Sequence, residues 1–170
     1  ASVVTCVTAQ NSVAVSAIHP TSTKVVAAQL DSVFNSLPIR AVKTGMLYSR
    51  SVVDAVTESL AKRSRLPLVV DPVLVSSSGT PLLKPSAMAT LAKRLLPLAR
   101  LVTPNLDEAE ALAKCPVREP EAMRDAARAI HERFGCAVLV KGGHMKATEA
   151  IDLFYDGSVE FLLSAPRIPG

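Results

Sequence analysis

The sequence is poor in aromatic residues and lacks the features that mark membrane, disulfide-stabilised and zinc-stabilised proteins. Only 4% of its 170 residues are aromatic, and none is tryptophan. No apolar run approaches the ~20 residues that a membrane-spanning helix requires. The three cysteines are odd in number and far apart, so they suit neither a disulfide framework nor a paired metal motif. These absences favour a reduced, cytoplasmic protein that does not act in a membrane.

The positive charge is modest and scattered along the chain. The formal net charge is +4, with 19 basic and 15 acidic residues. The basic side chains form no cluster, and no aromatic side chains lie between them to stack on bases. Solvated helix surfaces account for these charges more simply than a nucleic acid does. We therefore expect a small-molecule partner and no nucleic acid.

Short apolar segments alternate with longer amphipathic ones. Strands are predicted at 41–44, 68–70, 101–103 and 137–140, and helices at 21–35, 50–63, 86–96, 106–113 and 119–134. Two more strands are predicted at 2–8, as a buried strand, and at 12–19. A hairpin is predicted over 152–163, with its turn at the Asp156-Gly157 pair. Helices between successive strands imply an α/β domain with a mostly parallel sheet. No linker divides the 170 residues, which fit one domain.

Polar residues collect just after the predicted strands. Ligands of open α/β sheets bind outside the carboxyl ends of the strands. The residues at these ends are Gln10 and Asn11, Lys43 to Met46, Asp71, Thr103, Asn105 and Glu108, and Lys141 to His144. Such a concentration of amides, acids, lysines and glycines at one edge predicts a binding site there.

The stretch LVTPNLDEAEAL (101–112) has both a structural and a functional interpretation. Asn105 stands at a helix N-cap position and Glu108 follows three residues later, which is the spacing of a capping box. Acids in a first helical turn also suit the positive end of the helix dipole. A helix cap of this kind would place Glu108 one turn in, at the end of a parallel strand. Asp107 and Glu110 are predicted to be charges on a solvated face.

Other residues at this edge also admit two interpretations. Asp71 terminates a strand, but an acid there is well placed for Mg²⁺, usually through water. Lys141 with two following glycines is either a solvated turn or a phosphate-binding segment. Met46 and Val73 are either core residues or the walls around a flat heterocycle. His144 has no neighbouring ligands for zinc and no evident catalytic partner. The chain contains neither a P-loop nor a GxGxxG motif.

Six segments together resemble a known family. VTAQN, AVKTGML, VVDPVLVSSSG, LLPLARLVTPNLDEAEAL, VLVKGGH and SAPRI occur in this order across essentially the whole chain. They resemble the hydroxymethylpyrimidine and phosphomethylpyrimidine kinases of thiamine biosynthesis, in the ribokinase-like superfamily. The resemblance implies a three-layer α/β/α fold. It also implies ATP-dependent phosphorylation of 4-amino-5-hydroxymethyl-2-methylpyrimidine, and then of its monophosphate to the diphosphate, with ATP and Mg²⁺ as cofactors.

The resemblance assigns roles to individual positions. Gln10 matches the residue that hydrogen-bonds the aminopyrimidine, and Met46 and Val73 match the walls of its pocket. Asp71 and Glu108 match acids near Mg²⁺ and the phosphates. Five residues match positions of the family's nucleotide site: Asp71, Asn105, Glu108, Lys141 and Gly142.

Two family segments have no counterpart here. The family begins with a strand and a glycine-rich segment that closes over the substrate. It also carries, after the SAPRI stretch, an Asn-Thr-His-Gly-Thr-Gly-Cys segment that builds an anion hole and holds the catalytic residue. We therefore expect residues 1–170 to be one kinase domain that is incomplete at both ends, without its N-terminal strand and C-terminal helices. The catalytic residue is expected C-terminal to Gly170, and this chain alone is expected to have little or no activity.

Three other interpretations stay open at this stage. Pyridoxal kinases share the superfamily's fold and ATP chemistry, although Gln10 favours a pyrimidine. A non-catalytic remnant that binds a pyrimidine or a nucleotide is the second, and retention of the phosphate-site residues argues against it. A fragment that needs further segments to fold is the third. Family analogy alone implies a homodimer.

Overall fold

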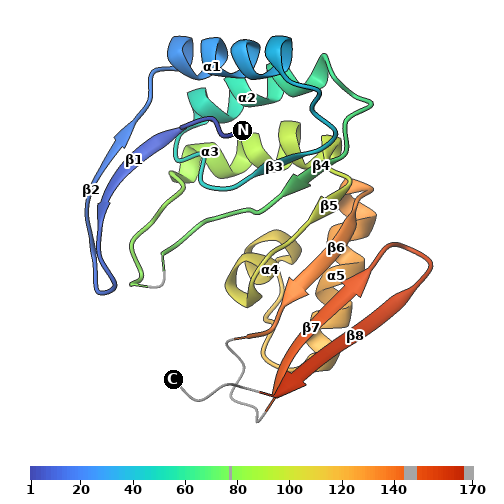
Figure 1. Cartoon of the computed structure of the whole chain (residues 1–170). Coiled ribbons are helices and arrows are strands. Elements are labelled where there is room, and N and C mark those ends of the chain that lie inside the picture. The colour runs from blue at the N-terminus through green and yellow to red at the C-terminus, as the bar shows by residue number, and fades with distance from the viewer. Residues whose placement is uncertain (77, 144–148, 167–170) are drawn as a thin grey trace.

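The larger of two sheets has six strands in the order β3-β4-β5-β6-β7-β8 (Figure 1). The structure, a computed structural model, describes residues 1–76, 78–143 and 149–166. The strands are β3 (Val42–Thr44), β4 (Leu68–Val70), β5 (Leu101–Val102), β6 (Ala137–Lys141), β7 (Glu149–Tyr155) and β8 (Glu160–Pro166). Strands β3 to β6 are parallel, and β7 and β8 add an antiparallel hairpin at one edge. The predicted α/β class, with a mostly parallel sheet, is confirmed.

The helices between the parallel strands cover one face of this sheet. They are α2 (Arg50–Ala61), α3 (Pro85–Thr90), a π-helical turn η1 (Leu91–Leu95), a 3-10 turn η2 (Leu96–Leu98), α4 (Leu106–Ala113) and α5 (Pro120–Phe134). Right-handed crossovers that always step in the same direction place their helices on the same side. Val70, Val102 and Val138 point into this layer and are fully buried. Val69 and Leu101, on the opposite face, are only partly buried.

The predicted helix over 86–96 is regular only at its start. It begins as α3, continues through one π turn and ends in a 3-10 turn that contains Pro97. Proline has no N–H to donate and its ring clashes with the preceding turn, so the helix cannot extend through it. The remaining helix, α1 (Thr23–Ser36), packs against α2.

The first strand is the main difference between the sequence prediction and the structure. Residues 2–8 are predicted to form a buried strand of the main sheet. Instead, β1 (Cys6–Gln10) pairs with β2 (Val15–Pro20) in a separate antiparallel two-stranded sheet (Figure 1). The turn between them is organised by the Asn11 side chain, which accepts hydrogen bonds of 2.8 Å from the N–H groups of Val13 and Ala14. The β-branched run therefore predicts an extended segment correctly. The polar turn that follows it brings β2, rather than a strand of the main sheet, alongside β1.

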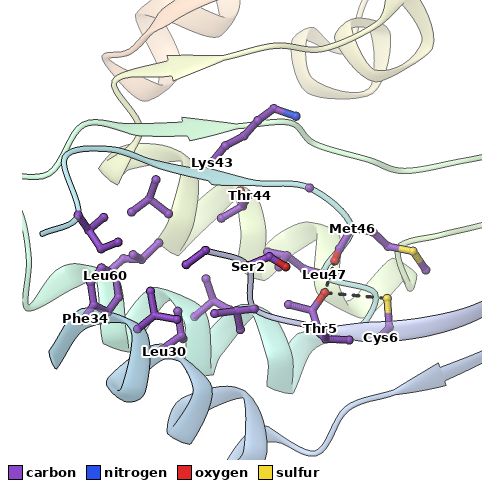
Figure 2. Close-up of a pocket in the computed structure, with 18 of the residues that line it drawn as sticks. Ser2, Thr5, Cys6, Leu30, Phe34, Lys43, Thr44, Met46, Leu47 and Leu60 are labelled. Carbon is purple, nitrogen blue, oxygen red and sulfur yellow. Dashed lines mark hydrogen bonds between the residues drawn. The ribbon is translucent and has the colours of Figure 1, made fainter. Parts of the chain in front are cut away.

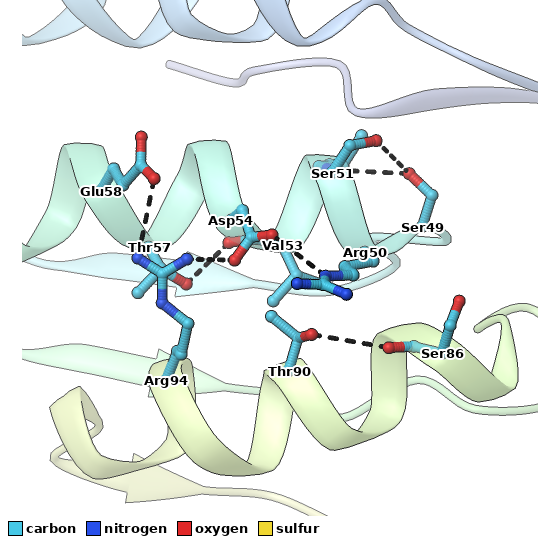
Figure 3. A network of polar contacts seen from close by, with 11 residues as sticks. Ser49, Arg50, Ser51, Val53, Asp54, Thr57, Glu58, Ser86, Thr90 and Arg94 are labelled. Atoms are coloured by element: carbon cyan, nitrogen blue, oxygen red, sulfur yellow. Dashed lines mark hydrogen bonds and ion pairs between the residues drawn. The ribbon is translucent and has the colours of Figure 1, made fainter.

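An ion-pair network ties α2 to η1 on the outer side of the helical layer (Figure 3). Arg94 of η1 contacts both Asp54 and Glu58 of α2, and Arg50 lies 3.6 Å from the same Asp54 carboxylate. Exposed pairs of this kind contribute about 0–1 kcal/mol each. The buried aliphatic residues beneath the network, such as Val53 and Leu91, therefore dominate the packing of these helices.

The β7–β8 turn depends on a glycine at 157. Asp156 accepts hydrogen bonds from the N–H groups of Ser158 and Val159, and Gly157 has φ +98°. A Cβ atom at Gly157 would lie 2.4 Å from Nε2 of His131. We expect Gly157→Ala to lower the free energy of unfolding by about 2–3 kcal/mol, because backbone strain and a steric clash combine. Urea denaturation measures this loss.

Gly135→Ala is the matched control for this prediction. Gly135 also has a positive φ, of +72°, but a Cβ atom there would meet no atom within 4 Å. Its substitution therefore carries the backbone cost alone, which we expect to be about 1 kcal/mol. Equal losses in the two variants would show that the contact with His131 contributes nothing.

Candidate active site

Asp71 lies between two lysines at the carboxyl edge of the six-stranded sheet. It follows β4, and its carboxylate oxygens are 2.8 Å from Nζ of Lys43 on β3 and 3.0 Å from Nζ of Lys141 at the end of β6. Lys141 is positioned by its own N–H, which donates to the carbonyl of Pro104 over 2.8 Å. The topology thus brings one acidic and two basic side chains, far apart in sequence, together at the carboxyl edge of the sheet.

The two lysines keep Asp71 ionised. Burial on its own would raise the pKa of the Asp71 carboxyl. Hydrogen bonds from Lys43 and Lys141, together with their positive charges, outweigh burial and hold that pKa below its ordinary value. A carboxyl with a lowered pKa in the folded state stabilises the fold above its unfolded pKa, and this contribution is lost as the pH falls through the folded pKa.

Asn105 and Glu108 form the predicted capping box at the start of α4. The Asn105 side chain accepts a hydrogen bond of 2.9 Å from the Glu108 N–H, and the Glu108 carboxylate accepts one of 2.8 Å from the Asn105 N–H. The other carboxylate oxygen of Glu108 accepts a bond of 3.3 Å from the N–H of Leu74, in the loop after β4. Glu108 is 4% exposed, so it lies beneath the surface rather than on a solvated face.

Burial raises the pKa of Glu108 above its ordinary value. The N–H groups of Asn105 and Leu74 and the charge of Lys141 oppose this shift, and the nearby Asp71 charge adds to it. Because the folded pKa is raised, the ionised Glu108 opposes folding at neutral pH, and this penalty disappears as the pH falls below the unfolded pKa. A cation near Glu108 would relieve the penalty.

If Mg²⁺-nucleotide binds at this edge, these opposite shifts predict a pH dependence of its affinity. We expect the affinity for Mg²⁺-nucleotide to fall as the pH is lowered from 7 toward about 4.3, the ordinary pKa of a glutamate. Glu108 takes up a proton in this range, whereas Asp71 stays ionised. Calorimetric titration at several pH values measures the effect. If a Glu108→Gln variant keeps the same pH profile, the titrating group is a different one.

The carboxylates at this edge fit a Mg²⁺ ion that is held partly by other ligands. Asp71 and Glu108 are close enough for the charge of one to affect the pKa of the other. Carboxylate oxygens are hard ligands, and Mg²⁺ in proteins is usually bound by one or two of them together with phosphate oxygens and water. Within the described residues, no group of three or more His, Cys, Asp or Glu side chains could hold a metal alone. The donors therefore suit a nucleotide-bound Mg²⁺ better than a protein cage.

Two threonine hydroxyls near the strand ends are buried without hydrogen bonds. Oγ1 of Thr44 and Oγ1 of Thr103 have no partner among the residues that the structure describes. Thr103 follows β5, and its N–H bonds to the carbonyl of Val70, which places it beside Asp71. A buried unpaired hydroxyl is costly, by about 1–3 kcal/mol, so such groups mark places where a ligand or water would bind.

Gly142 is already engaged within the protein. Its N–H donates to Oδ1 of Asp152 on β7 over 3.0 Å. The role predicted for Gly142, contact with a nucleotide phosphate, therefore requires this N–H to exchange partners and stays a prediction. His144, at the end of the same segment, lies outside the described residues.

Of the three residues predicted to contact a pyrimidine, Met46 alone lines the cavity beside the N-terminal segment. Met46 lines a cavity of about 510 Å³ between the N-terminal segment, β3, α1 and α2, and its carbonyl accepts a hydrogen bond of 2.6 Å from Thr5 (Figure 2). Val73 lies half-buried in the loop after β4, and Gln10 is exposed on β1. Neither lines this cavity. Their substrate roles stay predictions.

The prediction that Glu110 is a charge on a solvated face is wrong. Its carboxylate accepts a hydrogen bond of 2.8 Å from the N–H of Val117 and lies 3.1 Å from Arg118, so it ties α4 to the segment before α5. Val117 lies beyond the end of α4 at Ala113, so the periodicity of this helix does not reveal the contact. The same prediction for Asp107 is confirmed, because its side chain is 82% exposed.

Lys43 is the member of this site that the predicted assignments missed. The sequence placed it near the polar edge but gave it no role. The available signal was the strand register: Lys43 pairs with Val69, two residues before Asp71, so both side chains emerge on the same face of the sheet. Figure 2 shows the Lys43 side chain directed away from the cavity that Met46 lines.

Comparisons with known proteins agree with these features of the site. A family model described as phosphomethylpyrimidine kinase matches residues 1–170. The hydroxymethylpyrimidine/phosphomethylpyrimidine kinase of Rhizobium meliloti is 47% identical over 169 residues, which are 99% of this chain and 63% of that protein. The chain thus spans less than two thirds of that relative's length.

Solved structures show the same fold. The crystal structure of phosphomethylpyrimidine kinase from Clostridium difficile 630 matches with a TM-score of 0.84 and 38% identity, over 94% of this chain and 69% of that one. The pyridoxal kinase of Staphylococcus aureus, in complex with AMP-PCP and pyridoxal, matches with a TM-score of 0.84 and 29% identity, over 98% of this chain and 60% of that one. Both are similar in fold, and the first is also closer in sequence.

Proposed function

The chain belongs to the phosphomethylpyrimidine kinase family, and on this premise we propose that the protein is a kinase of thiamine biosynthesis. It transfers the γ-phosphoryl group of ATP to the hydroxymethyl group of 4-amino-5-hydroxymethyl-2-methylpyrimidine, and then to the monophosphate so formed. The observation that carries this proposal is the convergence of Asp71, Lys141 and the Asn105–Glu108 capping box at one sheet edge. Phosphoryl transfer depends mainly on positioning and charge neutralisation, which such a group of residues supplies.

Each residue of this group has a distinct part in the proposed reaction. Lys141 offers an ammonium to the nucleotide phosphates, and its contact with Asp71 holds that ammonium in place. Glu108 is oriented by two backbone N–H groups, so its carboxylate is fixed before a ligand arrives. Mg²⁺, when bound near Asp71 and Glu108, would neutralise charge that develops on the phosphates. Gln10, which is exposed on β1, contacts the aminopyrimidine in this proposal.

Location and assembly form a further part of the proposal. ATP as the phosphoryl donor and three free cysteines support a cytoplasmic protein. None of the helices in the described part of the chain is long and apolar enough to cross a membrane. A homodimer rests on family analogy and is tested directly by sedimentation equilibrium.

Pyridoxal phosphorylation is the second candidate, because the match to the Staphylococcus aureus pyridoxal kinase equals the match to the pyrimidine kinase in TM-score. The two pyrimidine kinases are 47% and 38% identical to this chain, and the pyridoxal kinase is 29% identical. The higher identity favours the pyrimidine as the substrate. ADP release measured with each acceptor in turn separates the two. We expect kcat/KM for the hydroxymethylpyrimidine to exceed that for pyridoxal at least about tenfold. The reverse ratio would make the protein a pyridoxal kinase. In a protein that carries the catalytic segment expected C-terminal to Gly170, binding of ATP without turnover would make it a non-catalytic binder.

A further inference from the structure

The chain leaves the six-stranded sheet directly after Lys141, and a side chain of the neighbouring strand follows it. β6 lies between β5 and β7 (Figure 1). The pairing of β6 with β7 ends at Lys141 and Asp152, whereas β7 continues its pairing with β8 as far as Glu149. The next N–H after β6, that of Gly142, donates to Oδ1 of Asp152 over 3.0 Å. A carboxylate thus accepts the hydrogen bond at the point where the backbone ladder stops.

The segment 141–143 is held on both sides. On the side of β5, the N–H of Lys141 donates to the carbonyl of Pro104 over 2.8 Å. On the side of β7, where the backbone pairing has ended, the Asp152 carboxylate holds Gly142. The direction in which this segment leaves the sheet therefore depends on Asp152.

We propose that Asp152 is a positioning residue of the nucleotide site, and that it acts as a hydrogen-bond acceptor rather than as a charge. This inference rests on the proposed function, in which Lys141 offers its ammonium to the nucleotide phosphates. By holding the Gly142 N–H, Asp152 fixes the backbone that carries Lys141 before a nucleotide arrives. A backbone that is ordered in advance reduces the entropy lost on binding.

Burial indicates that Asp152 keeps this contact when a nucleotide binds. Gly142 is buried and Asp152 is half-buried, whereas Gly143 is exposed. A phosphate therefore reaches the segment from the side of Gly143 and does not need the N–H that Asp152 holds. Leaving a buried N–H without an acceptor is costly, which favours a permanent contact.

The surroundings of Asp152 support a role as an acceptor. None of the ion pairs between described residues involves its carboxylate. The bond to the Gly142 N–H requires an oxygen at the right place, and a side-chain amide offers such an oxygen without a charge. Position and charge at residue 152 are therefore separable by substitution.

Binding of Mg²⁺ with AMP-PCP, a non-hydrolysable ATP analogue, to variants of Asp152 tests the proposal. Asp152→Asn keeps an acceptor oxygen in place and should bind the analogue within about threefold of the unmodified protein. Asp152→Ala removes the acceptor and should bind it about 10-fold more weakly, the size of one net hydrogen bond. Asp152→Glu keeps the charge but moves the oxygens by one methylene group, and should weaken binding by a similar factor. The affinity of each variant for hydroxymethylpyrimidine should change less than about twofold.

Asp156→Ala is the matched control. Asp156 belongs to the same hairpin and also accepts backbone N–H groups, but it follows Tyr155, which pairs with Val138 near the amino end of β6. Its substitution should lower the thermal stability of the hairpin, as Asp152→Ala does. It should leave the affinity for AMP-PCP within about twofold of the unmodified protein.

Calorimetry on variants that thermal unfolding shows to be folded separates the outcomes. If Asp152→Ala binds AMP-PCP as Asp156→Ala does, Asp152 only stabilises the hairpin. If Asp152→Asn binds as weakly as Asp152→Ala, the charge matters and the acceptor does not. Tighter binding by Asp152→Asn than by the unmodified protein would show that the carboxylate competes with phosphate. Each of these results overturns the inference and leaves the kinase proposal standing.

Two further outcomes complete the test. If Asp152→Ala does not fold, Asp152→Asn and Asp152→Glu decide, and equal affinities of these two variants for AMP-PCP overturn the inference. If the unmodified protein does not bind AMP-PCP with Mg²⁺, the proposed function fails, and the inference fails with it.

Discussion

Replacing Asp71 with asparagine is expected to lower the rate of phosphoryl transfer about 10²- to 10³-fold, the loss typical when one electrostatic group of a reaction site is removed. Asparagine has nearly the same shape but no charge. Lys43 and Lys141 would then lose their shared counter-charge, and the proposed Mg²⁺ position would lose one carboxylate. Both transfers should be affected, because Asp71 lies between the two lysines. Initial rates with saturating ATP and hydroxymethylpyrimidine measure the loss, in the protein extended by the catalytic segment expected C-terminal to Gly170.

Asp125→Asn is the matched control for Asp71→Asn. Asp125 is exposed on α5 and takes no part in the ion pairs of Asp71 with Lys43 and Lys141, so its substitution removes the same charge without touching the cluster. Thermal unfolding of both variants shows whether each one is folded. A folded Asp71→Asn protein with the rate of the Asp125→Asn protein would exclude Asp71 from the reaction.

Replacing Glu108 with glutamine is expected to weaken Mg²⁺-nucleotide binding about 10- to 100-fold. Both oxygens of Glu108 accept backbone N–H groups, from Asn105 and Leu74. Glutamine supplies one acceptor and one NH₂ group, so one of these N–H groups would face a donor instead of an acceptor. The charge beside the proposed Mg²⁺ position is also lost. We further expect a stability loss of about 1–3 kcal/mol, because a buried polar group is left unpaired.

The loss of stability and the loss of binding are separated by a neighbouring variant. Asp107→Asn alters the preceding acid of the same helical turn, whose side chain is exposed. It should reduce neither property by more than about 0.5 kcal/mol. Calorimetric titration with ATP, with and without Mg²⁺, measures the binding. If Glu108→Gln weakens ATP binding equally with and without Mg²⁺, Glu108 only caps α4.

Local sequence patterns predicted the parts of this site that depend on local contacts. The capping box of Asn105 and Glu108 was predicted from a spacing of three residues, and the structure shows both of its hydrogen bonds. The strand at 68–70 was predicted with its full bounds, and Asp71 follows directly from its end. These features depend on neighbours within a few residues, so the sequence contains the information needed to find them.

Features that depend on distant partners were missed. The β-branched run at the start of the chain predicted a strand but not that it would pair with β2 away from the main sheet. Glu110 was placed on a solvated face because its partner, Val117, lies beyond the next turn. Lys43 gained its role only because the sheet brings it to Asp71, 28 residues later. In each case the tertiary partner decided the outcome, and helical or strand periodicity contains no information about that partner.

A crystal structure of the protein with Mg²⁺ and a non-hydrolysable ATP analogue tests the central claim most directly. We expect the phosphates to lie at the carboxyl edge of the six-stranded sheet, with Lys141 in contact with phosphate oxygens and Mg²⁺ beside Asp71 and Glu108. A nucleotide bound at any other place, or one whose phosphates leave the Lys43–Asp71–Lys141 cluster unchanged, would contradict it.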